Sequence, residues 1–64
     1  MKVILRNPSR EVELSGARRV GEVLRRLQLT QEGVLVIRNG ELLTVDEEVG
    51  EEDVLEMRPV ISGG

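Results

Sequence analysis

The chain has 64 residues, with no cysteine, no histidine and no aromatic residue, and a formal net charge of −3. A chain this short forms one domain, and without cysteine or histidine it cannot carry a disulfide, a thiolate or imidazole metal site, a cysteine nucleophile or a Ser-His-Asp triad. It also lacks the aromatic stacking surface that single-stranded nucleic acids use, and no apolar run approaches the roughly 20 residues of a membrane helix. A strand-like segment follows Met1 at once, where a signal peptide would be apolar. We therefore expect a cytoplasmic monomer that holds no metal or cofactor, enters no membrane and binds no nucleic acid directly.

Charge is distributed unevenly along the chain. Residues 1–40 carry eight basic and four acidic side chains, whereas residues 41–64 carry one basic and eight acidic ones. This asymmetry predicts a negative end to the molecule, which would steer its encounter with a basic partner. The alternative is an acidic connection that is simply solvated.

The first elements form a predicted hairpin. Residues 1–6 are rich in β-branched side chains, and a period of two places the side chains of Met1, Val3 and Leu5 on one face. Residues 7–9 have turn chemistry, and residues 11–14 alternate again with their apolar side chains pointing inward.

A helix is predicted next, because the period of the apolar residues changes. From Val20, apolar residues recur at i, i+3, i+4 and i+7, which predicts an amphipathic helix of about three turns. Gly21 weakens the start of this helix, and no strong N-cap side chain precedes it. The exposed positions carry several arginines, which could contact phosphates but are more typical of a solvated face; they are Arg18, Arg19, Arg25 and Arg26.

A second hairpin follows the helix. Residues 34–38 form a continuous apolar run of strand length, Asn39-Gly40 suits a type I′ turn, and residues 41–44 return as a short strand. The acidic connection 45–53 does not have the ligand spacing of a calcium loop, so solvated carboxylates are the better interpretation.

The last predicted strand is 54–58, and Pro59 is predicted to mark where the chain leaves regular pairing. The resulting order, ββαββ with a final β, predicts an α+β fold in which one helix packs across one face of a mixed sheet. We expect residues 1–60 to form the domain and residues 61–64 to form a flexible C-terminal tail. The alternating positions predict a core of Val3, Leu5, Val12, Leu14, Val23, Leu24, Leu27, Val36, Leu43, Leu55 and Met57.

Two glycines end the chain directly after the predicted final strand. Glycine has no Cβ, so Gly63 and Gly64 would allow the tail to enter a narrow channel and place its carboxylate beside a nucleotide phosphate. A cloning remnant or a frayed end is the alternative explanation.

The whole chain resembles the ThiS/MoaD family of ubiquitin-like sulfur carriers, which have the β-grasp fold. The resemblance rests on residues 36–43 at the second hairpin, residues 52–57 entering the last strand and residues 59–64 at the end. Within the family, the chain is most similar to the carriers that serve tRNA 2-thiouridine formation in thermophilic bacteria. Many thiamine-type carriers have Gly-Asp where this chain has Glu52-Asp53, which leaves the branch open.

The resemblance implies a protein cosubstrate rather than an enzyme. An adenylating activating enzyme that uses ATP and magnesium would activate Gly64, and a persulfide protein would leave a thiocarboxylate there. A sulfur-accepting synthase, such as a tRNA thiolase, would then take the sulfur, and Ile61, Ser62 and Gly63 would be recognised as the tail. Open alternatives are a ubiquitin-like covalent modifier that acts through the same Gly64, a thiamine or molybdopterin sulfur carrier, and a non-covalent binding module.

Strand parity also predicts a partner surface. Ile4, Leu35 and Ile37 are expected on the sheet face opposite the helix, close to Arg58 and Val60 before the tail. Scattered surface aliphatics are the alternative.

Overall fold

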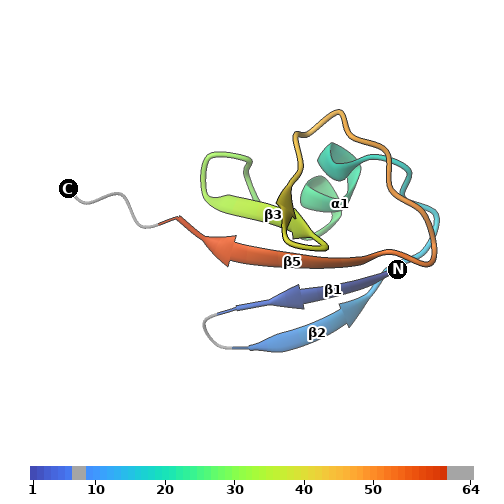
Figure 1. The fold of residues 1–64 in the computed structure, drawn as a ribbon, viewed down its shortest axis with the longest axis horizontal. Helices are drawn as coiled ribbons and strands as arrows, with labels where there is room; N and C mark the ends of the chain where they lie inside the picture. The colour runs from blue at the N-terminus through green and yellow to red at the C-terminus, as the bar shows by residue number, and fades with distance from the viewer. Residues whose placement is uncertain (7–8, 61–64) are drawn as a thin grey trace.

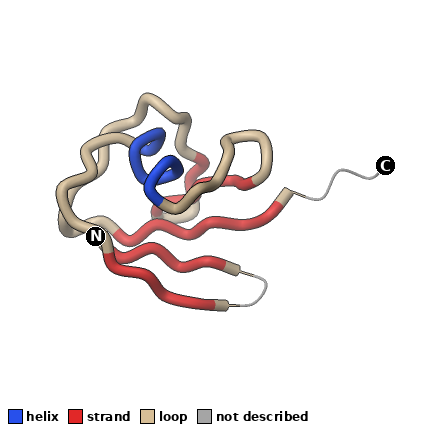
Figure 2. The backbone as a smooth tube through the Cα atoms, turned by 180° about the vertical axis from the view of Figure 1, so that it is seen from behind, coloured by secondary structure: helices blue, strands red, loops and turns tan. Residues whose placement is uncertain are grey.

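A computed structural model gives the fold and describes residues 1–6 and 9–60. One helix lies across one face of a five-stranded sheet, as predicted (Figures 1 and 2). Among the described residues, no helix is both long and apolar enough to cross a bilayer. In chain order the elements are β1 (Lys2–Leu5), β2 (Arg10–Glu13), α1 (Val20–Arg26), β3 (Val34–Arg38), β4 (Glu41–Leu42) and β5 (Val54–Pro59).

The last strand lies in the centre of the sheet. The strand order is β2-β1-β5-β3-β4, with β1 parallel to β5 and all other neighbours antiparallel. This is the mixed sheet of a β-grasp fold. β5 is paired on both sides and ends at one end of the sheet, while the N-terminus lies at the other end (Figure 1).

The core lies between the helix and the inner sheet face. Six of the predicted core residues are buried, four pack against them half-buried, and Val12 is half-buried beside Val3 on the same face. Met1 and Val20 are also buried, as their strand and helix periods indicate. Ala17 and Val49 are buried as well, although no periodic pattern surrounds them. The buried residues are Met1, Val3, Ala17, Val20, Val23, Leu24, Val36, Val49, Leu55 and Met57.

The helix is shorter than predicted. It has seven residues, about two turns, because the chain leaves the helical path at Gln28, which has a φ of 60°. The N–H of Leu29 donates to the carbonyl of Leu24 at 2.9 Å, and the N–H of Gln28 donates to the carbonyl of Arg25 at 3.1 Å. These two bonds form a Schellman motif, in which glutamine occupies the left-handed position that glycine usually takes. The apolar period continues to Leu27, and it therefore overestimates the length of the helix.

The N-cap residue, Arg19, makes no side-chain capping hydrogen bond, and backbone carbonyls of the acidic connection accept the first N–H groups of the helix. The N–H of Val20 donates to the carbonyl of Glu47 at 3.1 Å, and the N–H of Gly21 donates to that of Val45 at 2.9 Å. A Cβ at position 21 would lie 3.4 Å from this Val45 oxygen, an ordinary contact distance. The backbone of the connection is thus packed against the helix, while its acidic side chains at positions 46–48 and 51–52 remain exposed.

The path of the chain from the sheet to the helix also shortens β4. Leu43 donates its N–H to the carbonyl of Val36 at 2.8 Å, after which the chain leaves the sheet toward the helix. The predicted strand 41–44 therefore reaches only Leu42.

Pro59 remains in the sheet, contrary to the prediction that pairing stops there. It pairs with Val34 on β3, and the next residue, Val60, donates its N–H to the carbonyl of Gly33 at 2.9 Å. Because N–H groups alternate in direction along a strand, the proline nitrogen faces the β1 side, beyond the last described pair of β1 with β5 at Leu5. The next bond of the β1–β5 ladder, after the one from the N–H of Arg6 to the carbonyl of Met57 at 3.1 Å, would require an N–H at position 59. Proline has none, so the pairing with β1 ends there while the pairing with β3 continues.

Candidate functional site

The tail begins at a fixed point of the sheet. The predicted site residues Ile61, Ser62, Gly63 and Gly64 lie outside the described residues. The root of the tail is Val60, which is tied to Gly33 by the backbone hydrogen bond given above. Four residues can span at most about 14 Å. Whatever acts on the terminal carboxylate must therefore come close to this end of the sheet.

Next to the root lies the sheet face that the helix does not cover, which we call the open face. The registers place Ile4, Glu56 and Ile37 side by side on β1, β5 and β3, and Leu35 beside Arg58 one row nearer the tail. By strand alternation Val60 shares this face. The predicted partner residues are thus brought together, with Leu35 and Val60 each 44% exposed.

Leu42 belongs to the same surface and was missed from the sequence. It pairs with Ile37 across the β3–β4 hairpin and is 64% exposed, more than the other large aliphatic side chains of the described chain. A two-residue turn at Asn39-Gly40 fixes the pairing of the flanking residues, so counting outward from the turn would have placed Leu42 opposite Ile37.

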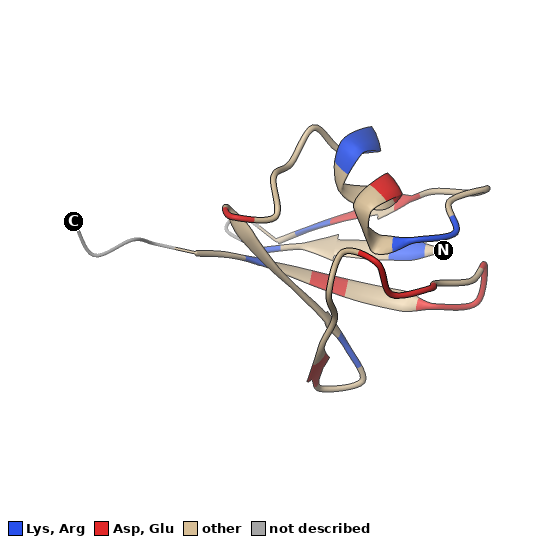
Figure 3. Cartoon of the chain, turned by 90° about the horizontal axis from the view of Figure 1, so that it is seen from above, with Lys and Arg blue, Asp and Glu red and all other residues tan. Residues whose placement is uncertain are grey.

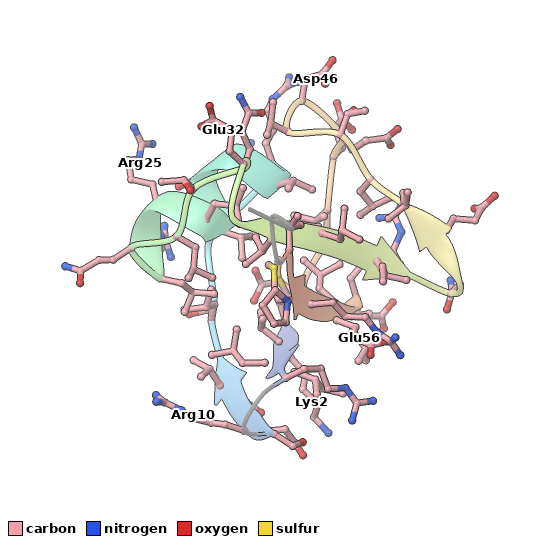
Figure 4. All side chains as sticks on the ribbon, turned by 90° about the vertical axis from the view of Figure 1, so that its left-hand side faces the viewer. Lys2, Arg10, Arg25, Glu32, Asp46 and Glu56 are labelled. Atoms are coloured by element: carbon pink, nitrogen blue, oxygen red, sulfur yellow. The ribbon has the colours of Figure 1, made fainter. Side chains whose placement is uncertain are left out.

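The open face is not purely apolar, because a charged cluster interrupts it. A single carboxylate oxygen of Glu56 accepts hydrogen bonds from Nε of Arg58 at 2.8 Å and from Nε of Arg6 at 2.9 Å. These two bonds, with the added Coulomb attraction, hold the pKa of Glu56 below its ordinary value. In Figure 4, which looks onto the tail end, the labelled Glu56 and Lys2 lie on the side of the sheet away from the helix. The face therefore combines aliphatic contacts with fixed charge.

The acidic connection forms part of the end of the domain that lies away from Val60. Acidic residues of the connection 45–53 and several basic residues lie together at this end (Figure 3). Several of the acidic residues are used locally: Asp53 pairs with Arg38 at 3.0 Å and accepts the N–H of Gly50 at 2.8 Å. The Thr44 hydroxyl donates to Asp46 at 2.8 Å, which lowers the pKa of that carboxyl. Within residues 1–6 and 9–60, no group of three or more acidic side chains is arranged to hold a metal ion.

Taken together, the fold is that of a β-grasp domain whose last described residue, Val60, lies beside a mixed apolar and charged face, and the sequence continues from there to Gly63-Gly64. The ThiS family model matches residues 3–64, and the chain belongs to this family. It is 52% identical, over 65 aligned positions that cover all of both chains, to the sulfur carrier protein TtuB of Thermus thermophilus. The resemblance predicted from the sequence is confirmed.

Proposed function

We propose that this protein is a sulfur carrier, and that its working group is the carboxylate of Gly64. The observation that carries the proposal is the match to the ThiS family over residues 3–64, which includes the Gly-Gly end of the chain. The position of the root supports it, since a carboxylate four residues after Val60 can lie at most about 14 Å from this anchored point beside the open face.

The chemistry belongs largely to partners. An activating enzyme with ATP and magnesium would bring the Gly64 carboxylate in line with the α-phosphate; the oxygen–phosphorus bond forms and pyrophosphate leaves. The terminal sulfur of a persulfide protein then attacks the acyl carbon and displaces AMP. A second thiol breaks the resulting sulfur–sulfur bond, which leaves a thiocarboxylate on Gly64. In this scheme the chain supplies a substrate of fixed length, and the partners supply positioning and charge stabilisation.

We place the docking of the activating enzyme on the open face. The aliphatic side chains Leu35, Ile37 and Leu42 offer area that is removed from water on binding, and the Glu56 cluster beside them fixes register through charge. A partner seated here would lie within the short reach of the tail from Val60.

For the acceptor we propose an activated carbon of a tRNA uridine, as in 2-thiouridine formation, reached through a tRNA thiolase. A terminal thiocarboxylate is a soft, transferable nucleophile that suits such a carbon. The full-length identity of 52% to the Thermus thermophilus sulfur carrier supports this branch above thiamine or molybdopterin synthesis. Offering the thiocarboxylated protein to each class of synthase, and following the sulfur, separates these acceptors.

The proposal is tested by shortening the tail. Deletion of Gly64, or Gly64→Val, should abolish pyrophosphate release with the activating enzyme and MgATP, because a displaced or bulkier end spoils the in-line geometry. The thermal midpoint should stay essentially unchanged, since chain ends contribute little to stability. Ser62→Ala is the matched control and should retain activation. Wild-type pyrophosphate release by the deletion variant would refute the assignment of Gly64.

A further inference from the structure

The basic side chains of this protein are almost all arginine. Of nine basic residues eight are arginine, and Lys2 is the only lysine. The tail end of the domain carries Arg6, Arg10 and Arg58. In general a guanidinium holds its proton far more tightly than a lysine ammonium, so at neutral pH a lysine supplies orders of magnitude more of the uncharged, nucleophilic form. An arginine therefore supplies positive charge while offering almost none of the uncharged, nucleophilic form.

Lys2 lies at the opposite end of the sheet from the tail root. In the parallel pairing of β1 with β5 it lies beside Val54, six residues before Val60, which is about 20 Å of strand. The four tail residues span at most about 14 Å, and a lysine side chain adds about 6 Å. The tail would have to reverse at Val60 and run fully extended along the sheet merely to touch Lys2. The α-amine of Met1 is at the same end and donates to the carbonyl of Leu14 at 2.9 Å.

Arg58, by contrast, lies within easy reach of the tail. It is two residues before Val60, about 7 Å along the strand, and its side chain is 58% exposed. Arg6 is joined to it through the shared oxygen of Glu56. An amine at this position would meet the end of the tail at an effective concentration of about 1 mM, because a short flexible linker joins the two groups. That is roughly 100-fold above the amine of another molecule at about 10 μM.

We propose that arginine at position 58 is a specificity-determining feature: it keeps positive charge beside the tail without an amine that would capture the activated carboxylate of its own chain. The inference rests on the proposed function, since it requires that Gly64 becomes an electrophile. In the capture reaction an amine nitrogen attacks the acyl carbon of Gly64 and a nitrogen–carbon bond forms. The bond from that carbon to AMP or to a thiolate breaks, and the amine proton passes to solvent. The product is a lactam that can no longer accept sulfur.

The test makes the electrophile chemically, without any partner. The full chain is prepared as a C-terminal thioester by cleavage of an intein fusion with a small thiol, in the wild-type, Arg58→Lys and Arg18→Lys forms. Arg58→Lys keeps the charge beside Glu56. Arg18 serves as the matched control because it lies after the end of β2. That end of β2 pairs with Lys2, at the end of the sheet remote from the tail. Each thioester is incubated at about 10 μM in mildly alkaline buffer, where the tethered amine has its roughly 100-fold advantage over amines of other molecules.

The products are distinguished by intact mass. For Arg58→Lys we expect a product one water lighter than the free carboxylate, with a peptide map that joins the introduced amine to Gly64. The wild type and Arg18→Lys should give the hydrolysed carboxylate. Hydrolysis of Arg58→Lys without lactam, or a wild-type lactam through Lys2 at a similar rate, would overturn the inference. Because the thioester needs no activating enzyme, either result is independent of whether the wild type releases pyrophosphate from ATP, which tests the proposed function alone.

Discussion

Replacing Leu24 by alanine removes a large side chain from the buried face of the helix. Leu24 is 4% exposed and belongs to the core between α1 and the sheet, whereas the next residue, Arg25, points to solvent. The substitutions Leu24→Ala and Arg25→Ala each truncate a long side chain to a methyl group, the first on the buried side of the helix and the second on its exposed side.

The expected cost of Leu24→Ala follows from its surroundings. Truncation of a buried leucine costs about 2–5 kcal/mol of unfolding free energy, depending on how far the site can relax. Leu24 also lines a hollow of ≈ 340 Å³ between the helix, β3 and residues 42–45, so solvent can refill part of the vacated space. We expect about 2–3 kcal/mol, against about 3–10 kcal/mol for the total stability of a domain this size. Arg25→Ala should change it by less than about 0.5 kcal/mol.

Urea unfolding followed by far-UV circular dichroism measures both values, and thermal melts give a second estimate. In a domain of this size 1 kcal/mol corresponds to about 4–8 °C, so Leu24→Ala should lower the midpoint by about 10–20 °C. Equal and small effects of the two substitutions would refute the assignment of helix faces and, with it, the packing of α1 on the sheet.

Two further predictions concern the open face. Ile37→Asp should leave the far-UV spectrum native and raise the KM of the activating enzyme for this protein by about 10-fold or more, since a charge enters the centre of the docking surface; an unchanged KM would exclude that surface. Glu56→Gln should be less stable than the wild type at neutral pH, because the lowered pKa of Glu56 means that its ionised form is favoured by folding. This difference should persist above the ordinary pKa of 4.5 and disappear as the pH falls through the lower folded value; urea midpoints that differ equally at pH 7 and pH 3 would contradict it.

The periodic parts of the chain could be predicted from the sequence, because local rules determine them. Alternation predicted β1 to within one residue at each end, the continuous apolar run predicted β3 with the observed bounds, and the Asn39-Gly40 pair predicted the second hairpin. The helix start at Val20 was right. Its end was not, since glutamine takes the left-handed position at which sequence rules expect glycine or asparagine.

The parts that depend on tertiary contacts could not be predicted. Val49 is buried because the backbone of the acidic connection is drawn onto the chain before the helix, where its N–H donates to the carbonyl of Arg18 at 2.9 Å. No local sequence pattern indicates that Val49 is buried. The same holds for the open face: parity placed Ile4 and Ile37 correctly, but the contact of Arg6 with Glu56 joins residues 50 positions apart. It follows only from the parallel pairing of β1 with β5.

The central claim is that sulfur is carried at the end of the tail, and the mass of the protein after sulfur transfer tests it most directly. The purified chain is incubated with the activating enzyme, MgATP and a persulfide donor, and its intact and C-terminal peptide masses are recorded. The account predicts exchange of one oxygen for one sulfur, confined to the peptide that ends in Gly64 and dependent on ATP. A carboxylate that remains unchanged while the activating enzyme consumes ATP on it, or sulfur found elsewhere in the chain, would contradict the account.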